Sequence, residues 1–215
     1  MFIPIGFFES VSSGSIVSGI YTTTMYKIEE QNYSESSPPY QKNGSQLLGR
    51  YERGRNQNGD IWWQTGYTSE ILSCISDIST IIGKTIDSFS VTYTVDSEHM
   101  LNTTSGFIRL FECTESWIDN GSTEPTFNDF LYGEFNYHYY DPWTNQLALA
   151  NESYNSLVTT TGPGTYTITS TNELKTLAQR WANGESNNGI IMGMTTQYFD
   201  SYLMISNIKF NITYH

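Results

Sequence analysis

The chain is short of charge, and of basic residues above all. Charged residues make up 15% of its 215 residues, and 10 Lys and Arg face 22 Asp and Glu, for a net charge of −12. A surface that binds phosphates needs clustered Lys and Arg. The one basic cluster, Arg50, Arg53 and Arg55, is more typical of a solvated turn. We therefore expect no nucleic-acid partner.

Cysteine and long apolar runs are scarce as well. Cys74 and Cys113 are too few for a disulfide framework, and their apolar surroundings favour buried thiols, with one disulfide as the alternative. No apolar run approaches the about 20 residues of a membrane span. The first residues also lack the basic segment and apolar core of a secretory signal. Three accounts fit: a leader removed from the mature chain, another export route, or exit from a cytoplasm inside a virus particle.

What the chain has instead is aromatic and hydroxyl-bearing residues. Aromatics reach 15% and include 16 Tyr, while Ser, Thr, Asn and Gly take the place of Lys and Glu as polar residues. This composition is typical of β-rich extracellular or particle-surface proteins.

Short strand candidates alternate with turn signals from about residue 20 onward. In DSFSVTYTV, apolar and hydroxyl-bearing residues alternate strictly, which places two sets on opposite faces of a strand. The final stretch shows the same period. The residues predicted to face a core are Phe89, Val91, Tyr93, Val95, Ile208, Phe210, Ile212 and Tyr214. These patterns predict an all-β fold, a β-sandwich.

One segment, STNELKTLAQRWANG at 170–184, predicts an α-helix. Ser170 and Glu173 have the spacing of a capping box, and Asn183-Gly184 is a helix-stop signal. One apolar stripe runs along it: Leu174, Leu177, Ala178 and Trp181. Since so short a helix is marginal alone, we expect it to close the open end of the sandwich, with Trp181 in the core.

The first residues read as a separate arm. We divide the chain into an N-terminal arm, 1–19, and a sandwich domain, 20–215. An arm that exposed its apolar tip would aggregate, so we expect the tip to pack on its own domain or to insert into a partner. The interface residues predicted there are Phe2, Ile3, Ile5, Phe7 and Phe8.

The run YTITSTNELKTLAQRWANGESNNGIIM resembles the C-terminal signature of DNRLRE-type domains. ILSCISDISTIIGKTIDSFSVTYTV, IRLFECTESW and ISNIKFNITYH follow other motifs of that family in the same order, so the resemblance covers roughly residues 20–215. It implies a jelly-roll β-sandwich, related to polysaccharide-binding modules and growth-factor propeptides. Members are generally non-enzymatic and occur in bacterial and archaeal surface proteins and in phage structural proteins. The chain departs from the family at Ile75, where an aspartate is usual.

The sequence has none of the common motifs of catalytic or metal-binding sites. His99, His138 and His215 are isolated, and no zinc, nucleophile-elbow or phosphate-loop motif occurs. We expect no catalytic residues, no resident metal and no cofactor. The alternative is a calcium ion bound at acidic loops. These loops are better interpreted as turns whose acidic side chains hydrogen-bond to their own backbone. The loop residues concerned are Asp96 with Glu98, Asp119 with Asn120, and Asn128 with Asp129.

Clustered aromatics are the remaining signal for a ligand. Flat aromatic side chains stack on sugar rings or anchor protein interfaces, although packing in the core or an interface is the favoured interpretation. The candidate ligand-binding residues are Trp62, Trp63, Tyr137, Tyr139 and Trp143.

Together these features predict a non-enzymatic structural protein on a virion surface, such as a capsid decoration, head-fibre, turret or tail-attachment component. Its expected partners are capsid or other virion proteins, and virion symmetry favours a homo-oligomer. The alternative is a carbohydrate-binding or adhesive module at a cell surface, with surface glycans as partners.

Overall fold

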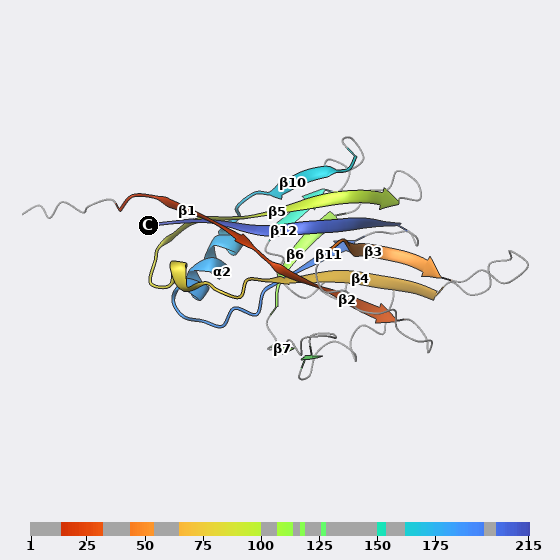
Figure 1. The fold of residues 1–215 in the computed structure, drawn as a ribbon, viewed down its shortest axis with the longest axis horizontal. Helices are drawn as coiled ribbons and strands as arrows, with labels where there is room; N and C mark the ends of the chain where they lie inside the picture. Colours follow the sequence, from red (N-terminus) through yellow and green to blue (C-terminus); the bar gives the residue numbers. More distant parts are fainter. Residues whose placement is uncertain are drawn as a thin grey trace, which may run out of the picture.

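The computed structural model describes residues 14–31, 44–53, 65–99, 107–113, 117–118, 126–127, 150–153, 162–195 and 201–215. These residues form two antiparallel sheets packed as a β-sandwich. One α-helix, α2 (Asn172–Ala182), and a short 3-10 helix, η1 (Ser79–Ile81), lie at one end of the described part (Figure 1). The predicted β-sandwich with a C-terminal helix is confirmed.

The first sheet is built around the last strand of the chain, β12 (Ser201–Tyr214). β5 (Ile86–His99) pairs with β12 along nearly its whole length, and β10 (Gly164–Ile168) pairs with the far side of β5. The other edge of β12 is shared. β1 (Val17–Thr22) pairs with its C-terminal half, and β3 (Gln46–Arg53) pairs with its N-terminal half.

The second sheet contains β2 (Thr24–Gln31), β4 (Thr65–Cys74), β11 (Ile190–Thr195), β6 (Phe107–Glu112) and β9 (Ala150–Ser153) in that order. β3 also pairs with β4, so the hydrogen-bonded path runs from one layer into the other. The chain also passes from the first sheet to the second between β1 and β2. At this point the hydroxyl of Thr23 donates a hydrogen bond to the carbonyl of Ile208 at 2.7 Å. A separate two-stranded sheet joins β7 (Trp117–Ile118) to β8 (Thr126–Phe127).

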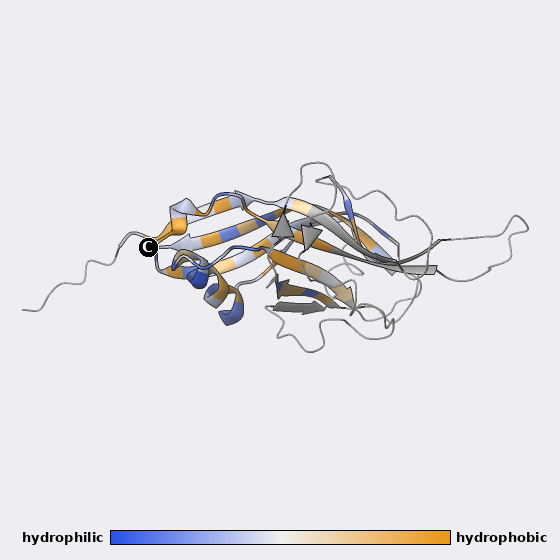
Figure 2. Cartoon of the chain, turned by 90° about the horizontal axis from the view of Figure 1, so that it is seen from below, coloured by the Kyte–Doolittle hydropathy of each residue, from blue (hydrophilic) through white to orange (hydrophobic). Residues whose placement is uncertain are grey.

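The core lies between the two layers and follows the alternation read from the sequence. Hydrophobic and hydrophilic residues alternate along the strands in Figure 2. Every residue predicted to face the core from β5 and β12 is buried: Phe89, Val91, Tyr93, Val95, Ile208, Phe210, Ile212 and Tyr214. The period-two prediction is therefore confirmed for both strands.

Helix α2 closes the sandwich as predicted. Its whole apolar stripe is buried, and Trp181, 1% exposed, packs against Phe89 and Phe210 with ring centroids 5.8 and 6.3 Å away. Gly184, at φ +95°, ends the helix.

The predicted capping box is wrong by one residue. Thr171 is the N-cap, and its hydroxyl accepts a hydrogen bond from the amide of Leu174 at 3.1 Å. The hydroxyl of Ser170 instead accepts a hydrogen bond from the amide of Phe89 on β5 at 3.0 Å.

The two cysteines are thiols, not disulfide-bonded, and Cys113 is buried while Cys74 is half-buried. Ile190 pairs with Ser73 on one side and Glu112 on the other, so the cysteines flank Gly189 across β11. Two strand spacings, about 9–10 Å, separate such residues, beyond the reach of a disulfide.

Candidate docking surface

The residues predicted to contact ligands or partners lie outside the described part of the chain. This holds for the aromatic set, Trp62, Trp63, Tyr137, Tyr139 and Trp143, and for the arm tip, Phe2, Ile3, Ile5, Phe7 and Phe8. Both sets stay predictions. A candidate docking surface is formed instead by described residues that follow the arm tip in sequence.

The described chain starts at the end of the sandwich that α2 closes. Gly14 lies beside the C-terminal residue, since a Cβ on Gly14 would be 3.6 Å from the Cβ of His215. The amide and carbonyl of His215 pair with those of Thr85, and the amide of Gly83 donates to the carbonyl of Ala182. Residues 1–13 therefore join the body where both the C-terminus and α2 are located.

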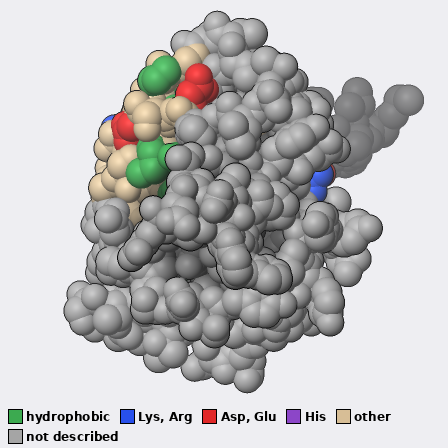
Figure 3. Space-filling view, turned by 90° about the vertical axis from the view of Figure 1, so that its right-hand side faces the viewer, with side chains coloured by type: hydrophobic (Ala, Val, Ile, Leu, Met, Phe, Trp, Pro, Cys, Tyr) green, Lys and Arg blue, Asp and Glu red, His purple; other side chains and the backbone are tan. Residues whose placement is uncertain are grey.

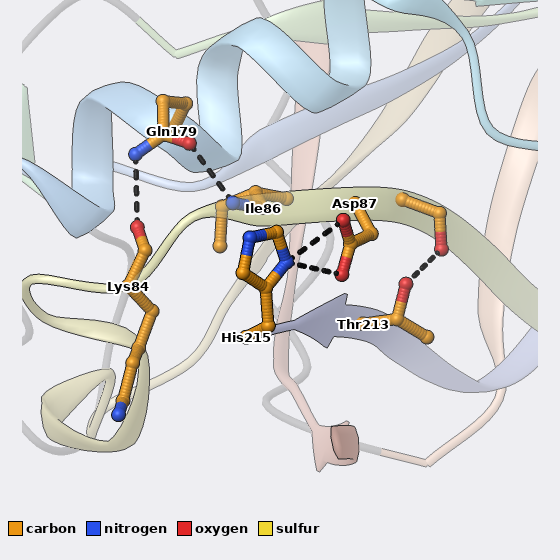
Figure 4. Close-up of polar contacts among 7 residues, drawn as sticks. Lys84, Ile86, Asp87, Gln179, Thr213 and His215 are labelled. Carbon is orange, nitrogen blue, oxygen red and sulfur yellow. Dashed lines mark hydrogen bonds and ion pairs between the residues drawn. The ribbon is translucent and has the colours of Figure 1, made fainter. Parts of the chain in front are cut away.

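Side-chain hydrogen bonds fix this end of the body (Figure 4). Gln179 of α2 accepts from the amide of Ile86 at 2.9 Å and donates to the carbonyl of Lys84 at 3.0 Å. His215 Nδ1 lies 3.1 Å from both carboxylate oxygens of Asp87. These bonds tie the helix, the start of β5 and the end of β12 together, so the end is a stable base for an attached segment.

Four large hydrophobic side chains are exposed among the described residues, and all belong to this end. Ile16 and Ile20 are each 71% exposed, Val17 is 45% exposed, and Ile82, next to η1, is 48% exposed. Val17 and Ile20 belong to β1, and Ile16 directly precedes it. Three exposed apolar residues within five positions form a cluster, which marks an interaction site more strongly than scattered ones do.

These three residues at the start of β1 were not among the interface residues predicted from the sequence. That prediction treats SVSSGSIVSG as a Ser- and Gly-rich stretch of the arm, whereas β1 starts inside it at Val17 and pairs with β12 in unbroken register. The β-branched pair Ile16-Val17 and the period-two spacing to Ile20 were the available signals.

Tyr21 anchors β1 to the body on its other face. Its hydroxyl lies 2.5 Å from the hydroxyl of Thr80 in η1. Burial raises the pKa of Tyr21 above its ordinary value, the Thr80 hydrogen bond partly opposes this, and Tyr214 adds to the rise. The neutral phenol therefore holds the strand in place at physiological pH.

The outer face of the first sheet carries short polar side chains. Cross-strand hydrogen bonds join them: Thr92 to Thr167 at 3.1 Å, Thr94 to Thr165 at 3.3 Å, Ser88 to Thr213 at 2.6 Å and Asn211 to Thr92 at 2.8 Å. Each hydroxyl oxygen has two acceptor lone pairs, so the face keeps hydrogen-bonding capacity for a ligand. Such a face is compatible with close approach of a flat, uncharged partner.

At the opposite end of the sandwich, shown in Figure 3, acidic side chains lie beside uncharged and hydrophobic ones. Asp96, one of the residues considered for calcium, accepts hydrogen bonds from Ser45 at 2.7 Å and from Ser206 at 2.9 Å. In the part of the chain that the structure describes, no group of three or more His, Cys, Asp or Glu side chains could hold a metal ion. Asp96 therefore joins β5 to β12 and to the start of β3.

Among the described residues, hydroxyl and imidazole groups are joined to one another and to carboxylates by hydrogen bonds. The hydroxyls of Ser88 and Thr213 bond to each other, and the one side chain bonded to His215 within the described ranges is Asp87. Within the same ranges, no helix is long and apolar enough to cross a membrane.

Comparison with known protein families, with curated proteins and with solved structures found no match. The resemblance to DNRLRE-type domains therefore stays a prediction.

Proposed function

We propose that this chain is a non-enzymatic structural protein of a virion surface, docked on the particle through its N-terminal end. The observation that carries this proposal is the exposure of Ile16, just before β1, and of Val17 and Ile20 on β1. These residues follow the apolar tip of the predicted arm in sequence, with the Ser- and Gly-rich residues 9–15 between the two apolar groups. A partner that covers both groups removes apolar surface from water, which favours binding.

The body supports a scaffolding role. Long antiparallel strands, a closed core and a helix bonded to two strands make a stiff unit suited to holding the N-terminal end in one orientation. A capsid decoration, head-fibre, turret or tail-attachment component fits this description. The ordered motifs support membership of the DNRLRE-type domains and a jelly-roll path for the strands, which form part of the proposal.

The test is whether the chain is a component of particles. Purified particles are analysed by quantitative mass spectrometry, and purified chain is mixed with particles stripped of it. A chain truncated before residue 14 keeps β1 and is expected to fold but not to rebind. A full-length Thr165→Lys variant, changed on β10 away from this end, is the matched control and should rebind normally. Absence of the chain from particles, or unchanged rebinding of the truncated chain, would contradict the proposal.

The hydroxyl-bearing outer face of β10, β5 and β12 favours a second candidate function, a carbohydrate-binding or adhesive module at the cell surface. A glycan array probed with the full chain tests it. Binding that is lost in Thr92→Ala or Thr167→Ala on this face, or in Trp62→Ala, Trp63→Ala or Trp143→Ala, would replace the virion role by this one. We expect no glycan to bind in this way.

A further inference from the structure

β1 is an edge strand without the usual protection. Among the described strands it pairs only with β12, so the backbone groups on its other side face no described strand. Natural edge strands carry Lys, Pro or bulges that prevent pairing with another chain. The sequence of β1, VSGIYT, contains none of these, and its register with β12 has no shift. The geometry of β1 therefore suits the addition of another strand.

Apolar side chains lie at the part of this edge that an added strand would contact. Ile20 lies on β1 and Ile16 directly precedes it, about 13 Å away if the extended backbone continues, and both are mostly exposed. Hydrogen bonds from an added strand would satisfy the backbone, and its side chains would cover these two isoleucines. A strand is therefore a better occupant than a loop or a helix.

Charge favours a second copy of this chain as the source of that strand. The chain carries a net charge of −12, so two copies repel each other except where their surfaces are locally neutral. β1 has no charged residue, and the β12 segment opposite it, Lys209–Tyr214, contains one positive residue, Lys209. β1 and the β12 segment paired with it therefore bring no carboxylate of their own to a contact between identical chains, and among the described residues the one carboxylate whose charge acts on Tyr21 is Asp77.

Building on the proposed docking role of the same end, we propose that β1 pairs antiparallel with β1 of a second copy. The two-fold axis passes beside Gly19, so Ser18 of each copy lies opposite Ile20 of the other, and the two Ile20 side chains meet diagonally. The pair joins two β10-β5-β12-β1 layers into one continuous sheet. It also brings two arms to one assembly, which allows bivalent attachment to a particle.

The experiment is analytical ultracentrifugation of the full chain between about 1 and about 300 µM, where mass action reveals a dimer. We expect a reversible dimer whose dissociation constant rises at least about tenfold in Ile20→Lys. Thr165→Lys on the β10 edge is the matched control and should leave the constant unchanged. Since Ile20 is 71% exposed, Ile20→Lys should keep the wild-type thermal unfolding curve.

A cross-linking measurement tests the register separately. The double variant Ser18→Cys/Ile20→Cys should oxidise to a covalent dimer, whereas Ser18→Cys alone should not, because its predicted neighbour is Ile20. A wild-type chain that is monomeric throughout, or a dimer unaffected by Ile20→Lys, would overturn the inference. Monomeric chain that still rebinds particles through residues 1–13 would leave the proposed function standing and reject only the strand pairing.

Discussion

Trp181 of α2 and Phe210 of β12 stack with ring centroids 6.3 Å apart and planes inclined by 22°. The helix that closes the sandwich is thus attached through its largest side chain to the central strand of the first sheet. Phe89 on β5 completes the aromatic cluster, in edge contact with Phe210 at 5.2 Å. The stability of the end that carries the docking surface depends on this cluster.

Removing the Trp181 side chain should destabilise the whole domain. Trp181→Ala leaves a large cavity beside Phe89 and Phe210, and we expect it to lower the free energy of unfolding by about 3–5 kcal/mol. Urea unfolding followed by circular dichroism measures the change. Lys175→Ala, on the exposed side of the same helix, should change it by less than about 0.5 kcal/mol. Equal effects of the two substitutions would show that α2 does not seal the core.

The assignment of Thr171 as the N-cap can be tested by removing its side-chain hydroxyl. Thr171→Ala removes the hydroxyl that accepts from Leu174, and we expect a loss of about 1 kcal/mol in the free energy of unfolding. Thr171→Ser keeps that oxygen and should restore most of the loss. If the two variants unfold at the same denaturant concentration, the hydroxyl of Thr171 is not the cap.

Two glycines with nearly the same backbone angle should respond differently to alanine. Gly184 and Gly189 have φ of +95° and +94°, so alanine strains the backbone at both by about 1–2 kcal/mol. At Gly184 nothing lies within 4 Å of the added Cβ, whereas at Gly189 it would be 2.5 Å from the carbonyl oxygen of Ser73. We expect Gly189→Ala to cost at least about 2 kcal/mol more than Gly184→Ala in unfolding experiments. Similar costs would contradict the close approach of β11 to β4.

Alkaline pH should weaken the attachment of β1. The pKa of Tyr21 in the folded protein lies above its ordinary value of 10.0, so between those two values the unfolded chain binds fewer protons than the folded one. The contribution of the neutral phenol is therefore complete below pH 10 and declines as pH rises toward the folded-state pKa.

Tyr21→Phe lacks this titration and isolates it from the other tyrosines. Unfolding free energies of both proteins are compared at a pH of about 8 and about 11. The wild type should lose stability relative to Tyr21→Phe at the higher pH. Parallel pH profiles would show that the Tyr21 hydroxyl does not titrate differently in the folded state.

Local patterns predicted the elements whose determinants lie within a few residues. The alternation Phe89, Val91, Tyr93 placed β5 with the right face inward, because the side-chain period of a strand is two. The stripe ending at Trp181 placed α2 and its buried face for the corresponding reason. Both predictions depend only on which side chains of a segment share its apolar face.

What the sequence could not supply were contacts between distant segments. Ser170 and Thr171 are both residue types that cap helices, and in the structure the hydroxyl of Ser170 accepts from the amide of Phe89, 81 residues away. The exposure of Ile20 likewise depends on which strand lies beyond β1, which no local pattern encodes. The docking surface was therefore predicted in kind, as an apolar N-terminal end, while its β1 residues were missed.

The central claim is that the N-terminal end, with β1, is the surface through which this protein contacts its partners, the particle and a second copy of the chain. Hydrogen–deuterium exchange of the amides of residues 17–22, measured by mass spectrometry in dilute chain and in the particle-bound protein, tests it most directly. The account predicts that their exchange slows at least about tenfold on binding, while residues 164–168 of β10 exchange at an unchanged rate. Unchanged exchange in β1, with protection appearing on β10 or nowhere in the sandwich, would contradict it.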